Sequence, residues 1–167
     1  MNSAILEDIE QLEAEELQTM GSFNHGYFQI RLGALLSKTG EYTVVAELNL
    51  DVGKLDLSQF EVKSREEVKP DLCVYPRRRI NRSQDIVRMA EMPLLVVEIL
   101  SPLQGVQTIL NNFRVYFALG VRSCWLVEPA MGAVAVYHDL DNPRTFSSGE
   151  IVDEVVGIRL SVEEIFG

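Results

Sequence analysis

The chain contains few of the residues on which many small proteins build their chemistry. Its 167 residues include two cysteines and two histidines, and no lysine follows Lys69. Cys73 and Cys124 lie in separate apolar runs without CxxC spacing, which predicts two buried free thiols rather than a disulfide or a zinc site. The sequence has no GxGxxG, GxxxxGK[ST] or GxSxG stretch. Dinucleotide-binding, P-loop and serine-hydrolase chemistry therefore have no support.

Long apolar segments are also missing. No window reaches the roughly 18 uninterrupted apolar residues that a membrane span requires, so we expect no membrane association. The first residues are acidic and lack the basic and apolar regions of a signal peptide, which predicts a cytoplasmic protein. The length predicts one domain over residues 1–167, with residues 1–22 as an N-terminal helical extension.

Positive charge is scarce and unevenly distributed. The net charge is −10, from 15 basic and 25 acidic residues, and this argues against DNA binding by bulk charge. Arginines nevertheless crowd one segment between two apolar runs, and residues 123–167 contain only two. This segment is either a basic nucleic-acid-binding patch on an acidic body or a solvated loop. The candidate binding residues are Arg77, Arg78, Arg79 and Arg82.

Hydrophobic periodicity predicts an α/β fold. Helical spacing indicates helices over residues 4–18, 25–37 and 106–119, and a short helix at the C-terminus. Alternation and turn residues indicate strands over 42–52, 54–64, 71–75 and 94–100, and a hairpin formed by 121–129 and 132–140. This order predicts a mixed central sheet with one crossover helix between 94–100 and 122–127.

Two acidic residues stand where strands are predicted. Asp71 heads the apolar run "DLCVY", and Glu98 lies inside "LLVVEILS". Burying a carboxylate is costly unless it is paired, protonated or metal-bound. If the strands are neighbours, the two acids converge and need a cation between them at neutral pH. A divalent ion such as Mg²⁺ or Mn²⁺ is the natural occupant, and it suits phosphodiester hydrolysis.

Glu47 is a third acid of interest, in the strand-like stretch "VVAELNL". On a strand next to that of Asp71 it would serve as a third metal ligand. On an edge strand it would face solvent without a role. Period-2 alternation leaves both interpretations open.

Four stretches of the chain resemble a known family. They are "PD" at 70–71, "VVEILSP" at 96–102, "YFALGV" at 116–121 and "CWLVEP" at 124–129. Together they look like the Uma-type putative restriction endonuclease family, a domain of unknown function within the PD-(D/E)XK nuclease superfamily. The resemblance runs from about residue 23 to residue 166.

This resemblance implies a restriction-endonuclease-like core, with a mixed central sheet flanked by helices, and a metal-dependent site that acts on DNA. Asp71 and Glu98 match the metal-binding acids of the family. His25 matches a histidine that many members carry, and we expect it to pack at or cap the start of its helix. Enzymes of this type commonly act as dimers, and the predicted helix over 4–18 either packs on its own domain or forms a homodimer.

The chain departs from the family at the catalytic lysine. The superfamily pattern places it two residues after the second acid, where this chain has Leu100. Many family members carry it four residues before a tyrosine that matches Tyr116, and that position holds Asn112. Three interpretations remain: a nuclease that uses Asn112 or a cation such as Lys69 instead; a degenerate nuclease that binds nucleic acid or protein without cutting; or a fold in which Glu98 is a relic. The sequence leaves open whether the protein is an enzyme.

Overall fold

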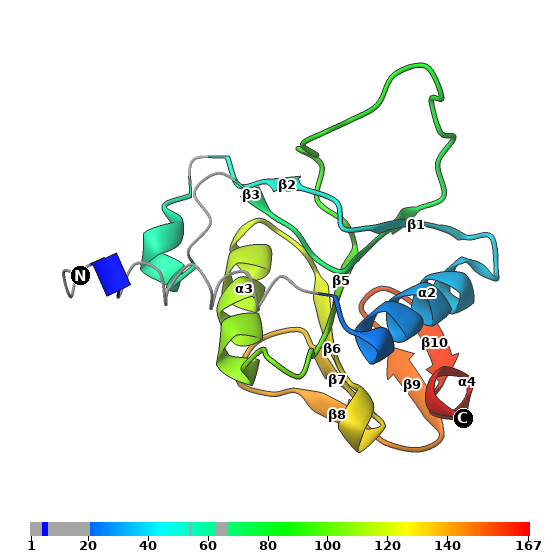
Figure 1. Ribbon diagram of the computed structural model, residues 1–167. Coiled ribbons are helices and arrows are strands. Elements are labelled where there is room, and N and C mark those ends of the chain that lie inside the picture. The colour runs from blue at the N-terminus through cyan, green and yellow to red at the C-terminus, as the bar shows by residue number, and fades with distance from the viewer. Residues whose placement is uncertain (1–4, 7–20, 54, 63–66) are drawn as a thin grey trace.

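The computed structural model describes residues 5–6, 21–53, 55–62 and 67–167 (Figure 1). Most of the predicted helix over 4–18 lies outside the described residues, so its role stays a prediction. The centre of the molecule is a six-stranded sheet in the order β1-β4-β5-β6-β7-β8. Its strands are β1 (Tyr42–Ala46), β4 (Leu72–Pro76), β5 (Leu95–Ile99), β6 (Ser123–Glu128), β7 (Ala133–Tyr137) and β8 (Arg144–Phe146).

The sheet is mixed, as the sequence predicts. β5 and β6 are parallel, and the other neighbouring pairs in this sheet are antiparallel. The crossover between β5 and β6 is α3 (Val106–Ala118), which confirms the predicted helix at this place. Parallel neighbours need such a crossover because a tight turn cannot join them. The predicted hairpin is β6 and β7, joined by the short 3-10 helix η2 (Pro129–Met131).

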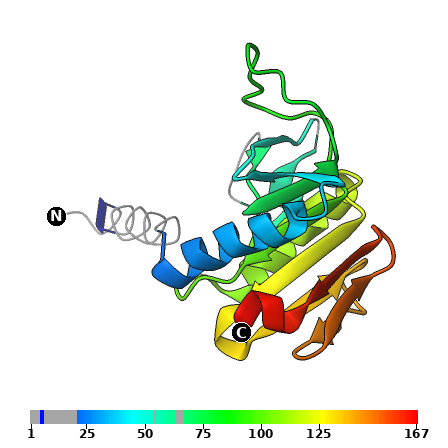
Figure 2. The same cartoon turned by 90° about the vertical axis from the view of Figure 1, so that its right-hand side faces the viewer.

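Helices cover both faces of the sheet (Figures 1 and 2). α2 (Phe23–Ser37) packs on one face through Leu32 and Leu36. α3 packs on the other through Ile109 and Phe113. The buried strands alternate between these two cores, since successive side chains point to opposite faces. The short C-terminal helix α4 (Val162–Phe166) lies beside α2.

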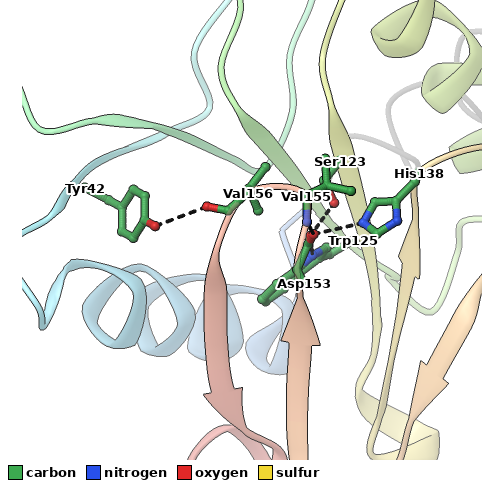
Figure 3. A network of polar contacts seen from close by, with 7 residues as sticks. All are labelled: Tyr42, Ser123, Trp125, His138, Asp153, Val155 and Val156. Carbon is green, nitrogen blue, oxygen red and sulfur yellow. Dashed lines mark hydrogen bonds and ion pairs between the residues drawn. The ribbon is translucent and has the colours of Figure 1, made fainter.

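A smaller sheet of β9 (Glu150–Asp153) and β10 (Ile158–Ser161) extends the core on the α2 side. Its attachment is polar as well as apolar (Figure 3). The fully buried carboxylate of Asp153 accepts hydrogen bonds from the Ser123 hydroxyl and from Trp125 Nε1, the latter at 2.8 Å. Its other oxygen lies 2.8 Å from His138 Nε2 and accepts from the backbone N–H of Val155. Asp153 therefore joins β9 to β6 and to the end of β7.

Two strand predictions are wrong in part. The predicted strand over 42–52 is broken after Ala46, because Glu47 adopts a left-handed conformation with φ of 50°. β2 (Leu50–Asp51) then pairs with β3 (Glu67–Val68) in a separate two-stranded sheet. Within 54–64, the structure has the 3-10 helix η1 (Leu57–Phe60) in place of a strand. The Asp56 side chain accepts from the Ser58 N–H, and such local bonding competes with strand pairing.

Cys73 and Cys124 are free and buried, as predicted. In the part of the chain that the structure describes, no helix has the length and apolar character needed to cross a membrane.

Candidate functional site

The register of the central sheet brings the three predicted acids into one row. β4 pairs with β5 through Leu72 opposite Val97, and with β1 through Leu72 opposite Ala46. One step further along β4, Asp71 stands between Glu98 and Glu47. The backbone N–H of Glu47 donates to the Asp71 carbonyl at 3.1 Å. Glu47 directly follows β1, Asp71 directly precedes β4 and Glu98 lies on β5, so the three acids come from neighbouring strands of the sheet.

A pocket of about 300 Å³ opens onto this row. The same pocket is lined by groups from α2, from the segment before β4, and from α3. Its acids and its principal polar groups are Glu47, Asp71, Glu98, His25, Lys69 and Asn112. Every acid, histidine and asparagine predicted from the sequence as a site residue therefore lies in one cavity.

Glu98 is the buried member of the row, with 5 % of its surface exposed. It lies on the α3 face of β5, where the hydroxyl of the buried Tyr116 donates to its Oε1 at 2.6 Å. Burial, and next the charge of Asp71, raise the pKa of Glu98 well above its ordinary value. Two carboxylates forced together behave in this way. Without a bound cation, Glu98 therefore holds its proton to higher pH than a solvated glutamate.

Asp71 is held from two directions. Its Oδ2 accepts the backbone N–H of Ile99 at 2.7 Å and lies 3.0 Å from His25 Nε2. The hydrogen bond with Asp71 raises the pKa of His25 above its ordinary value. The cap of α2 is Ser22, whose hydroxyl accepts from the backbone N–H of His25. The ring of His25 therefore contacts the metal-binding candidate, and the expected capping role belongs to Ser22.

Glu47 lies at the rim of the pocket, and its side chain is exposed. Among the described residues, no group of three or more His, Cys, Asp and Glu side chains is placed to hold a metal ion. The role of Glu47 as a third ligand stays a prediction.

The donor set of Asp71 and Glu98 fits a hard divalent cation. Mg²⁺ sites commonly use one or two carboxylates and complete the shell with water and substrate phosphate oxygens. Two converging acids in an open polar pocket leave room for those further ligands.

The predicted arginines lie away from the acids. Their segment, residues 77–94, follows β4, whereas Asp71 precedes it. A five-residue strand separates these ends by roughly 17 Å, and the loop stands out from the body of the molecule (Figures 1 and 2). None of the four candidate arginines, all of which the structure describes, lines the acidic pocket. The four arginines are therefore not part of the acidic pocket, and their role in nucleic-acid binding stays a prediction.

One of the four arginines has a structural role. Both terminal nitrogens of Arg78 lie 2.9 Å from the carboxylate oxygens of Glu91. Its guanidinium also stacks 4.4 Å from the centre of the Tyr75 ring. Arg78 thus closes the base of the loop, whereas Arg77 and Arg82 are exposed.

The hydrogen bond from Tyr116 to Glu98 is not among the features predicted from the sequence. A signal for it existed, since a tyrosine within an apolar helix face needs a partner for its hydroxyl when buried. Gln29, whose amide donates to the Asp71 carbonyl at 2.9 Å, carried no such signal.

Comparisons with known proteins agree with this architecture. A search of curated proteins finds no match. Among solved structures, the chain is similar to the crystal structure of a putative nuclease belonging to DUF820 from Anabaena variabilis, with 19% identity and a TM-score of 0.68. The similarity covers 88% of this chain and 82% of that chain, and at this identity it shows a shared fold.

A family model extends the comparison to the sequence. The model for Uma2, described as "Putative restriction endonuclease", matches residues 10–163. This range includes the whole central sheet and all the acids of the pocket. The chain belongs to the Uma2 family of restriction-endonuclease-like proteins.

Proposed function

We propose that the protein is a metal-dependent nuclease that hydrolyses phosphodiester bonds in DNA. The observation that carries this proposal is that Asp71, directly before β4, and Glu98, on the neighbouring β5, line the same open pocket. Membership of a family described as restriction endonucleases supports the same reaction class.

In the proposed reaction, each of the main residues of the pocket has a separate role. Asp71 and Glu98 would hold Mg²⁺ or Mn²⁺, which when bound polarises a phosphoryl oxygen and lowers the pKa of water. His25 fixes the orientation of Asp71, and Tyr116 fixes that of Glu98. Asn112, on α3, can hydrogen-bond water or phosphate because its amide both donates and accepts.

The loop of residues 77–94 supplies a surface for DNA. Arg77 and Arg82 are exposed on it, and Arg79 lines an open cavity together with Arg82. Because the chain as a whole carries −10, a protruding basic loop is the part that attracts a phosphate backbone. Its distance from the acids suits a long substrate that spans both sites.

The metal site is tested by titrating Mn²⁺ into the protein in a calorimeter. We expect binding by the wild type, and loss of binding in Asp71→Asn and Glu98→Gln. Glu128→Gln serves as the matched control, because Glu128 ends β6 and is not among the residues lining the pocket. Equal binding by the wild type and both site variants would contradict the proposed site.

Cleavage is tested on supercoiled plasmid with Mg²⁺ or Mn²⁺. Nicking that disappears in Asp71→Asn but persists in Glu128→Gln would support the nuclease. Metal binding without nicking would favour the second candidate function, a degenerate nuclease that binds nucleic acid or protein without cutting. Asn112 in the family's lysine position is the observation that favours this alternative.

We also propose that the protein forms a homodimer through α2. The outer face of this helix carries three exposed apolar side chains one turn apart, Phe23, Tyr27 and Ile30. Leu32 and Leu36 already bury the opposite face. A helix that is apolar on both faces is typical of a buried element. The same patch on a second copy, related by a two-fold axis, is self-complementary.

A further inference from the structure

The acidic pocket contains a lysine from the short segment between β3 and β4. Lys69 lies between β3 and β4, two residues before Asp71, and lines the same cavity as Asp71, Glu98 and Asn112. Its side chain is exposed to solvent. Of the lysines and arginines that the structure describes, Lys69 alone lines this pocket.

Pro70 explains why Lys69 faces the acids. A residue that precedes proline is restricted to extended conformations, and in an extended segment residues two apart project to the same side. Lys69 and Asp71 therefore face the pocket together, while Pro70 is buried. The segment is anchored at both ends, since Val68 pairs with Leu50 and Leu72 pairs with Val97.

The charge balance of the pocket calls for such a cation. Glu47, Asp71 and Glu98 bring three carboxyl groups, and the ring of His25 is engaged by Asp71. A phosphodiester adds negative charge, which spreads over the phosphoryl oxygens as the attacking water approaches. Asn112 can donate a hydrogen bond but carries no charge. An ammonium on a flexible four-carbon stem supplies both charge and donors.

We propose that Lys69 is a catalytic residue of this pocket, whose ammonium group binds a non-bridging phosphate oxygen as the bond to water forms. This inference rests on the proposed nuclease function. One water is consumed: its oxygen bonds to phosphorus, and the bond from phosphorus to one ester oxygen breaks. One proton of the water ends on that leaving oxygen and the other leaves to solvent. Lys69 stays protonated throughout.

The test compares Lys69→Met with the wild type under single-turnover conditions on plasmid DNA with Mg²⁺ or Mn²⁺. Loss of one transition-state donor typically lowers the rate by about 10² to 10³, and we expect that loss in Lys69→Met. Affinity for an uncleaved duplex in EDTA, measured by fluorescence anisotropy, should change less than about tenfold, as for a single phosphate contact. Lys38→Met is the matched control, because Lys38 pairs with Glu164 on the surface and does not line the pocket.

A second variant separates lost charge from lost folding. In Lys69→Met/Asn112→Lys, an ammonium returns to the pocket from α3, and we expect cleavage faster than that of Lys69→Met. Thermal unfolding and Mn²⁺ calorimetry verify that both variants fold and bind metal.

Three results would overturn the inference. The first is cleavage by Lys69→Met at the wild-type rate. The second is a fall in its cleavage rate no larger than the fall in its affinity for DNA. The third is a folded double variant that cleaves no faster than Lys69→Met. The first of these leaves the nuclease function standing if Asp71→Asn is inactive. Absence of cleavage by the wild type overturns both proposals.

Discussion

Glu98 is buried beside a second carboxylate and receives a hydrogen bond from Tyr116. Burial raises its pKa, and the neighbouring Asp71 raises it further. An acid whose folded-state pKa is raised stabilises the folded protein less as the pH increases. Between the ordinary value and the folded pKa, the unfolded chain releases a proton that the folded chain keeps. Glu98 therefore lowers the stability of the folded protein at neutral pH when no cation is bound.

We predict that Glu98→Gln stabilises the metal-free protein at neutral pH. The amide oxygen can still accept from Tyr116, and the amide N–H groups can donate to Asp71. The gain should be on the order of 1 kcal/mol at pH 7 and should shrink towards about pH 4, where glutamate is protonated in both states. Urea unfolding in EDTA at both pH values measures it. A variant that is less stable than the wild type at pH 7 would contradict the electrostatic account.

Among the secondary-structure elements, β9 makes its polar contacts with the central sheet through one buried acid, Asp153. Burial alone would raise the pKa of Asp153, but the hydrogen bonds from Ser123, Trp125 and His138 outweigh it and lower the pKa below its ordinary value. The stabilisation is therefore present above the ordinary value of 3.8 and is lost as the pH falls through the folded-state pKa. Ser123 is fully buried, so this network is a structural junction (Figure 3).

We predict that Asp153→Asn lowers the free energy of unfolding by about 1 to 3 kcal/mol at pH 7, since buried donors lose a charged acceptor. The difference from the wild type should decrease below about pH 3. Glu150→Gln, on the exposed part of the same strand, should change stability by less than about 1 kcal/mol. Equal effects of the two substitutions on urea unfolding would show that the network contributes no more than a surface pair.

The loop of residues 77–94 carries the exposed arginines Arg79 and Arg82, which we propose to contact DNA. We expect Arg79→Ala/Arg82→Ala to weaken binding to duplex DNA and to reduce the slope of log affinity against log salt by about 2, because two phosphate contacts are lost. Arg144→Ala/Arg159→Ala removes the same charge from β8 and β10. Anisotropy titrations at several salt concentrations compare them. Equal losses in both double variants would mean that the loop has no special part in binding.

At the scale of the whole molecule, the outer face of α2 is an apolar surface on an acidic protein. Phe23 is 88% exposed and Ile30 is 77% exposed. Stable interfaces bury about 800 Å² per partner, which is more than three side chains supply, so the proposed interface extends beyond Phe23, Tyr27 and Ile30.

We predict a dimer in light scattering for the wild type and a monomer for Ile30→Glu, because a buried unpaired charge opposes association. Val87→Glu, a substitution at a comparably exposed residue in the loop of residues 77–94, should leave the dimer intact. A monomeric wild type would refute the proposed interface.

The sequence alone determined the parts of this protein that depend on local chemistry and near neighbours. The apolar stripe of α3 and the flanking strands predicted the crossover, since only a right-handed helical connection joins parallel neighbours easily. The isolated acids Asp71 and Glu98 were conspicuous because the runs around them are apolar. The resemblance to a known family added the reaction class and the histidine at residue 25.

The tertiary structure decided what depends on register and on the direction of strands. Period-2 alternation could not say whether Glu47 shares a row with Asp71, because that depends on which residues of β1 and β4 pair. Nor could it place the arginines at the far end of β4 from the acids. The position of Lys69 in the pocket depends on how β3 and β4 are placed on either side of Pro70, which the sequence alone does not specify. Sequence spacing specifies which side chains exist and how they repeat, but long-range pairing alone determines which of them meet.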